Sequence, residues 1–207
     1  MALTQPWGPA EFAGIVLMWA LMMIAMMLPS VSPVFLLFAR ARAGNGGKAA
    51  VSTTFFAAGY FLVWIGFSIG AAGLQLGLHT AALLTSGSAI SNPLLAGAVL
   101  VGAGAFQFSP LKHRCLSHCR NPLGSLMSHW RSGRVGALAM GTRHGKFCLG
   151  CCWVEMLVLF VVGVRNFAWI VLLAAFVVLE KLGPRGDLAA RAGGAVMIAA
   201  GIALIAA

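Results

Sequence analysis

The chain contains very few acidic residues. Among 207 residues there are only four Asp or Glu side chains, and charged residues of every kind make up 9% of the chain. Soluble domains normally contain about a quarter of charged residues, so this composition excludes an ordinary soluble protein. The sequence also has no Walker motif, no dinucleotide-binding glycine fingerprint, no HExxH sequence and no serine hydrolase elbow. It therefore gives no support to the enzyme classes that these motifs define.

Apolar residues dominate what is present. They make up 60% of the sequence, and their long stretches are rich in Gly and Ala. Such a composition is typical of a polytopic membrane protein. We therefore predict an all-α fold in which residues 1–207 form a single integral membrane domain in contact with a lipid bilayer.

The apolar segments predict about six transmembrane helices. They cover residues 12–38, 52–78, 93–108, 148–164, 167–182 and 192–207. Pro29 and Pro33 should kink or break the second half of the first segment. Residues 109–147, between the third and fourth segments, are too polar to face lipid. We expect them to form a re-entrant or interfacial segment of short helices, separated by Pro110 and Pro122.

The basic residues are distributed unevenly between the predicted loops. The chain has 14 Lys and Arg residues and a formal net charge of +10. All of them except Arg165 fall in the first, third and fifth loops, counting Lys181, at the end of segment 167–182, with the fifth loop. The positive-inside rule places these loops in the cytoplasm and both termini outside it. We predict a multi-pass membrane protein, whose positive charge reflects topology and not nucleic-acid binding.

One segment, residues 108–156, contains most of the reactive side chains. It holds all five cysteines and four of the five histidines. On a helix, residues three and four positions apart share a face. The second half of the segment therefore places an imidazole, three thiols and a carboxylate on one stripe: His144, Cys148, Cys151, Cys152 and Glu155. This combination is typical of a site for Cu(I), Zn(II) or an iron–sulfur centre. Cysteines that merely pack in a core are the alternative.

The first half of the same segment contains a second cluster. Cys115, His118 and Cys119 have helical spacing, so one turn of helix would present two thiols and an imidazole together. The separation of Cys119 from Cys148 is too long for a zinc finger, so the fold has to assemble any shared site. The thiols suit metal binding and disulfide exchange alike, although a reducing cytoplasm argues against a structural disulfide. His129, at the expected membrane interface, is a further candidate ligand.

Glu155 is an unusual residue within a predicted transmembrane helix. A carboxylate in hydrocarbon is costly unless it is paired, protonated or bound to a metal. The sequence leaves all three roles open.

A methionine-rich stripe lies in the first predicted helix. Met18, Met22 and Met26 are spaced by four residues, and Met23 and Met27 broaden the stripe. Thioethers select Cu(I), whereas methionine is also a common filler of cores. If the first span packs beside the fourth, the methionines could pass copper to the cysteines.

Short motifs spread over nearly the whole chain form one pattern. They are FSPLK (108–112), CL (115–116), CR (119–120), PL (122–123), HWRSG (129–133), MG (140–141), HG (144–145), CLGCCW (148–153) and a methionine-rich run at 18–30. The pattern resembles a bacterial family of predicted metal-binding integral membrane proteins, a domain-of-unknown-function family. The resemblance implies a metal site at Cys115, Cys119, His129, His144, Cys148, Cys151 and Cys152.

Two functions are compatible with these patterns. The first is a membrane-embedded protein that binds a soft metal, copper ahead of zinc and iron, for its handling, transport or loading into a partner. The second is an integral-membrane oxidoreductase, either metal-dependent or a thiol–disulfide enzyme. Histidines and a methionine stripe favour the first, because a thiol enzyme needs neither. A copper-receiving protein or a second copy of the chain would be the partner. The candidate ligands are Met18, Met22, Met26, Cys115, His118, Cys119, His129, His144, Cys148, Cys151 and Cys152.

Overall fold

The computed structural model of the chain describes residues 8–42, 48–85 and 87–206. These residues form nine helices and no strand, apart from one isolated bridge between Leu84 and Ile90. The predicted all-α fold is confirmed. The helices are α1 (Pro9–Ala41), α2 (Lys48–Thr80), α3 (Pro93–Gln107), α4 (Pro110–Arg120), α5 (Pro122–Met127), α6 (Gly133–Leu157), α7 (Leu159–Val162), α8 (Phe167–Leu182) and α9 (Gly186–Ala206).

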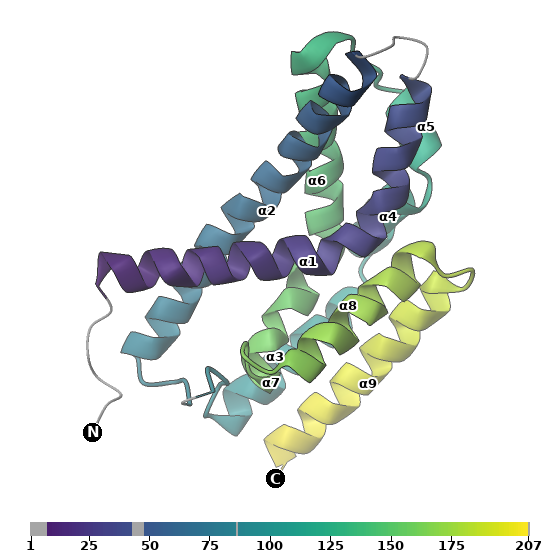
Figure 1. Cartoon of the computed structure of the whole chain (residues 1–207). Helices are drawn as coiled ribbons and strands as arrows, with labels where there is room; N and C mark the ends of the chain where they lie inside the picture. The colour runs from purple at the N-terminus through teal and green to yellow at the C-terminus, as the bar shows by residue number, and fades with distance from the viewer. Residues whose placement is uncertain (1–7, 43–47, 86, 207) are drawn as a thin grey trace.

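Helix α1 contains two prolines in its interior, Pro29 and Pro33. Each removes a backbone hydrogen bond and crowds the preceding turn. Figure 1 shows α1 changing direction sharply in its second half. The predicted kink is therefore confirmed, and the helix continues past both prolines without a break.

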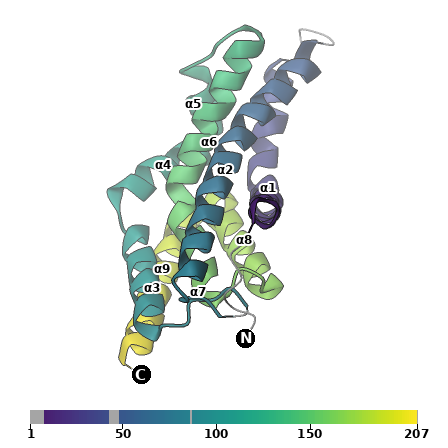
Figure 2. The same ribbon diagram turned by 90° about the vertical axis from the view of Figure 1, so that its left-hand side faces the viewer.

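Helices α2 and α6 lie side by side through the centre of the molecule (Figures 1 and 2). Glycines make their close approach possible. A Cβ atom on Gly59 of α2 would overlap the carbonyl oxygen of Leu138, and one on Gly141 of α6 would overlap that of Phe56. Small residues allow helices in membranes to approach in this way. The crossing fixes α6, which carries three of the five cysteines, against α2.

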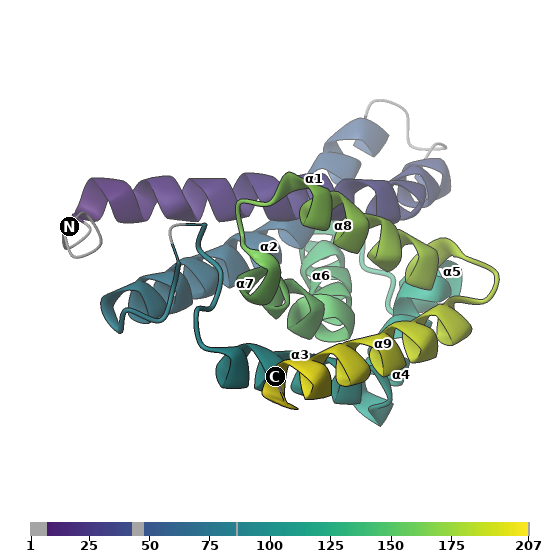
Figure 3. The same cartoon turned by 90° about the horizontal axis from the view of Figure 1, so that it is seen from below.

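Helices α3 and α9 form a second close pair, seen from below in Figure 3. Gly104 of α3 faces Gly194 of α9 so closely that a Cβ atom on either would meet the opposing carbonyl oxygen. After α3 the chain bends by 61° into α4. The bend turns α4 toward α6, and Leu116 and the cysteines of α4 are buried there.

Four of the described helical segments are long and apolar enough to cross a membrane: α1, α2, α6 together with α7, and α9. The bent pair of α3 and α4 would make a fifth. The predicted number of six is not confirmed, because α3 has only 15 residues and α8 only 16. Helices of this length extend for about 23 Å, whereas the hydrocarbon is ~30 Å thick. Both chain ends lie outside the described residues, and the membrane orientation stays a prediction.

The largest difference from the sequence prediction concerns α6. The helix begins at Gly133 and not at Cys148, where the predicted fourth span began. Residues 133–147 therefore continue a long helix and do not form a separate interfacial piece. Small buried residues such as Gly136 and Gly141 pack this half of the helix against its neighbours, while Lys146 stays exposed. The segment is polar in composition because one face of this packed helix is exposed.

Candidate metal centre

Three cysteines of α6 lie on the buried face of this helix. Cys148, Cys151 and Cys152 are 2%, 1% and 0% exposed. The thiols of Cys151 and Cys152 donate hydrogen bonds to the carbonyl oxygen of Cys148 at 3.0 and 2.9 Å. The helix also contains His144 and Glu155 among its buried residues, so the predicted stripe forms one face of a continuous helix.

Helix α4 brings two more cysteines to the same place. Ser109 caps its N-terminus, and Cys115 and Cys119 lie on its buried face. The Cys119 thiol lies close enough to the thiols of Cys148 and Cys151 to interact with them electrostatically. Cys115 packs beside them, close to the backbone of α6. We define the thiol cluster as Cys119, Cys148, Cys151 and Cys152.

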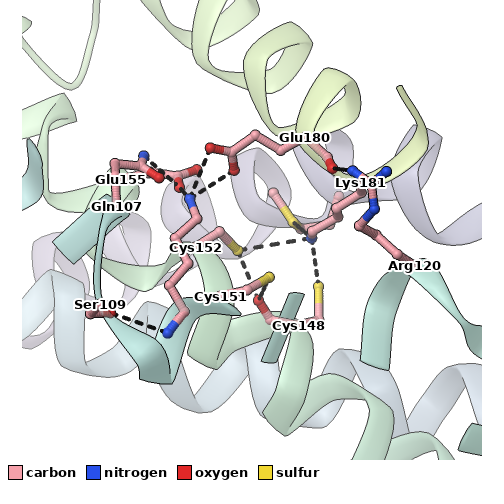
Figure 4. Close-up of polar contacts among 11 residues, drawn as sticks. Gln107, Ser109, Arg120, Cys148, Cys151, Cys152, Glu155, Glu180 and Lys181 are labelled. Carbon is pink, nitrogen blue, oxygen red and sulfur yellow. Dashed lines mark hydrogen bonds and ion pairs between the residues drawn. The ribbon is translucent and has the colours of Figure 1, made fainter. Parts of the chain in front are cut away.

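A buried lysine contacts the thiol cluster from α8. Nζ of Lys181 donates a hydrogen bond to Sγ of Cys148 at 2.9 Å and lies 3.9 Å from Sγ of Cys152. The thioether sulfur of Met27, from α1, is 3.7 Å from the same nitrogen. The hydroxyl of Tyr60, from α2, is 3.0 Å from Sγ of Cys148. Figure 4 shows the Lys181 side chain reaching between the sulfur atoms. Five helices therefore contribute to this group of soft and ionisable side chains.

The thiols are gathered but do not surround a common point. Among the described residues, no group of three or more His, Cys, Asp or Glu side chains has the geometry to hold a metal ion. Hydrogen bonds hold the Cys151 and Cys152 sulfurs against the backbone of α6, so metal binding would require both thiols to rotate. All five cysteines are free. The donors that are present, thiols and a thioether, are those that Cu(I) prefers.

A second buried polar cluster involves α4, α6 and α8, which also contribute residues to the first group. Nζ of Lys112, from α4, donates to one oxygen of Glu155 on α6 and to both oxygens of Glu180 on α8. Gln107 donates to the same oxygen of Glu155 at 3.0 Å. Lys112 and Glu155 are fully buried, and Glu180 is 1% exposed. We define the carboxylate cluster as Lys112, Glu155 and Glu180 (Figure 4). Of the roles left open for Glu155, the structure shows pairing.

The candidate histidines lie in three different environments. His144 is 6% exposed, and its ring centre is 5.9 Å from that of Tyr60, which contacts Cys148. His129 is exposed and lines a small cavity together with His144. His118 stacks on Phe147 and makes a 2.9 Å hydrogen bond to the Arg114 carbonyl. His144 therefore lies next to a residue that contacts the thiol cluster, and His118 lies on the helix turn that carries Cys119.

The buried methionines of α1 are not the three that the spacing by four predicted to lie together. Met18 and Met22 are only partly buried, whereas Met23, Met26 and Met27 are buried. Helix α1 packs mainly on α2 and α8, and Met27 reaches the thiol cluster through Lys181. Copper binding by Met18, Met22 and Met26 stays a prediction.

Comparison with known protein families gives this donor set a context. The model of the PpoB2 family, described as copper chaperones, matches residues 16–204. The chain belongs to this family of copper chaperones. The match spans every residue of the thiol cluster and the carboxylate cluster, and it agrees with the metal-related family that the motifs resemble. No curated protein and no solved structure matches the chain.

Sequence reasoning did not assign Lys181, Tyr60 or Lys112 to a site. Lys181 is separated from Cys148 by 33 positions, and Tyr60 is separated from it by 88. Their proximity depends on helix packing, which no local pattern encodes. One signal was present, because Glu180 and Lys181 are adjacent charges at the end of an otherwise apolar segment. Charges in such a position need partners inside the protein.

Proposed function

We propose that this protein is a membrane-embedded copper chaperone that holds Cu(I) at the thiol cluster and passes it to a partner. The observation that carries the proposal is the buried ammonium of Lys181, 2.9 Å from Sγ of Cys148 and 3.7 Å from Sδ of Met27. Its positive charge lies among soft donors, where a cuprous ion would also be bound. Membership of a copper chaperone family supports the choice of metal.

The charge of Lys181 suits a copper–thiolate complex in a buried place. Cysteines bind metals as thiolates, so metal binding releases their protons. Two thiolates and one Cu(I) ion have a net charge of −1, which one ammonium group cancels. Without such a cation a buried anion is costly. Lys181 is 5% exposed and can compensate this charge without help from water.

The same cluster suits delivery as well as binding. The thiols of Cys151 and Cys152 donate hydrogen bonds to the Cys148 carbonyl, so their protonated forms have a partner within the helix. A carrier must release its metal, and a partner for the protonated thiols lowers the cost of release. The recipient would be a copper-receiving protein with thiols or thioethers of its own. We place the protein in a bacterial inner membrane with both termini extracytoplasmic, as the distribution of basic residues indicates.

The test is metal binding by detergent-purified protein, with thiol counting on the same sample. We expect Cys148→Ser and Cys151→Ser each to abolish tight Cu(I) binding, because each removes a thiolate from the cluster. We expect His79→Ala, at the far end of α2, to leave it unchanged. We also expect Cu(I) to protect cluster thiols from alkylation. Full copper occupancy in both cysteine variants would contradict the proposal, and reversible disulfide formation without metal binding would favour a thiol–disulfide enzyme.

A further inference from the structure

Two adjoining cavities lead from the surface toward the thiol cluster. The outer one has a volume of about 310 Å³ and is lined in part by His129, Trp130 and Arg131. The inner one, of about 10 Å³, lies between α5 and α6 and is lined in part by Leu126 and His144. The two cavities share His129, Met140 and Arg143. The inner volume approaches that of a single water-sized guest.

Three side chains with soft or borderline donors meet at the inner cavity. His129 is exposed, whereas Met140 and His144 are 5% and 6% exposed. Nδ1 of His129 is bonded to the Ser128 hydroxyl at 2.8 Å, which leaves its Nε2 for a ligand. Sδ of Met140 accepts one hydrogen bond, from the Arg131 backbone N–H at 3.3 Å, and retains a lone pair.

His144 is the least expected member of this group. It is 6% exposed and lines the inner cavity. Its ring contacts are with Phe56 and Tyr60. An imidazole that lines a cavity can present a ring nitrogen to a metal ion there, and histidine is the commonest metal ligand. Two imidazoles and a thioether together suit Cu(I).

Helix α6 connects this cavity to the thiol cluster in regular steps. Met140, His144, Cys148 and Cys152 follow one another at intervals of four residues, and all are buried. Residues at this spacing share a helix face and are about 6 Å apart along the axis. The donors change along the series from thioether to imidazole to thiol. A thiolate binds Cu(I) more strongly than a thioether does, so the series leads the ion inward.

We propose that His129, Met140 and His144 form a transfer site through which Cu(I) enters and leaves the thiol cluster. The proposal rests on the proposed function, because the thiol cluster is the destination of the ion. Arg131 and Arg143 line the outer cavity. They repel every cation, and a dication about twice as strongly as a monocation, so they favour Cu(I) over divalent metals.

Loading kinetics test the transfer site. Tetrakis(acetonitrile)copper(I) is mixed with metal-free protein in detergent, and thiolate-to-copper charge-transfer absorbance is followed by stopped flow. We expect Met140→Leu and His129→Ala each to slow loading about tenfold, which corresponds to ~1.4 kcal/mol of barrier. Final copper occupancy should not change, because the thiol ligands remain. Leu nearly preserves the volume of Met, and His129 is exposed, so neither variant should disturb folding.

Matched controls lie outside both cavities. Met127→Leu changes a methionine of α5 that is 65% exposed, and His113→Ala changes an imidazole of α4. Both should load at the wild-type rate. Wild-type rates in both Met140→Leu and His129→Ala would overturn the transfer site. A wild-type protein that takes up no copper would contradict the proposed function instead.

A second measurement observes the site directly. In a variant whose four cluster cysteines are replaced by serine, X-ray absorption should show weakly bound Cu(I) with nitrogen and thioether sulfur neighbours. Adding His144→Asn should remove this signal. A signal that persists unchanged after this substitution would overturn the assignment of His144, whatever the kinetics show.

Discussion

The carboxylate cluster, and the thiol cluster taken together with Lys181, are built on the same three helices, α4, α6 and α8, and each has one buried lysine. Their contacts differ. Lys112 donates to three carboxylate oxygens, so its hydrogen-bonding capacity is used completely. Lys181 has one short contact, to Cys148, and two long ones, to Met27 and Cys152. The first lysine is locked by hard oxygen atoms, whereas the second is held loosely by soft sulfur atoms.

The comparison suggests that the two neighbouring clusters have different roles. Oxygen ligands with a fixed cation give α4, α6 and α8 a defined arrangement. Sulfur ligands with a loosely held cation leave room for a metal to come and go. Both glutamates pair with Lys112, which keeps two hard ligands away from the metal. The carboxylate cluster would then stabilise the fold, and the thiol cluster would bind copper.

The largest expected effect is on the carboxylate cluster. Lys112→Met removes its only cation and leaves two carboxylates buried without a counter-charge. Breaking a buried ion pair by removing one partner costs about 3–5 kcal/mol, so the unfolding temperature of the detergent-solubilised protein should fall strongly. Lys146→Met, on an exposed part of α6, is the control. If Lys181→Met destabilises the protein more than Lys112→Met does, the proposed difference between the clusters is wrong.

An intermediate effect is expected at Lys181. Lys181→Met should keep the protein folded, because cluster thiols can remain neutral without it. It should weaken Cu(I) binding about tenfold, or ~1.4 kcal/mol, because the anionic copper–thiolate complex loses its counter-charge. Competition with a chromogenic Cu(I) chelator measures this change. Lys181→Arg should restore most of the affinity, and a failure of arginine to do so would mean that charge is not what matters.

The smallest effect is expected at Glu155. Glu155→Gln removes one of two carboxylates and leaves Lys112 paired with Glu180, so the charges are then balanced. We expect a change in unfolding free energy of about 1 kcal/mol or less, and no change in copper affinity. Isothermal denaturation and chelator competition on the same preparation test both statements. A large loss of copper affinity would show that Glu155 takes part in metal binding after all.

The local part of the site could be predicted from the sequence. The spacing of Cys148, Cys151 and Cys152 places them on one face of any helix, and the structure contains that helix. The spacing of Cys115 and Cys119 did the same for α4. From the sequence, we could say only that the fold has to bring the cysteine faces of α4 and α6 together. Whether they meet depends on the 61° bend after α3, which sets the direction of α4.

The number of membrane spans could not be obtained from apolar length. Residues 93–108 and 167–182 were predicted to be spans because they are apolar, yet the helices that form there, α3 and α8, are too short for a full crossing. Residues 133–147 read as interfacial because they contain Arg and Lys, yet they form the first half of the long helix α6. Packing against α2 buries one face of this half of α6. The average polarity of a segment does not show whether one of its faces is buried.

The glycine crossing between α2 and α6 determines which parts of the protein can move during the proposed copper exchange. At Gly59 and Gly141 the two backbones meet without intervening side chains, so neither helix can slide past the other without a collision. In contrast, α4 and α8 are joined to α6 through side chains, and Arg120 bonds to the carbonyl oxygens of Glu180 and Gly183 at the end of α8. Side-chain contacts can be exchanged one at a time. Helices α2 and α6 thus act as the fixed frame, and a partner that withdraws copper would have to act on α4 or α8.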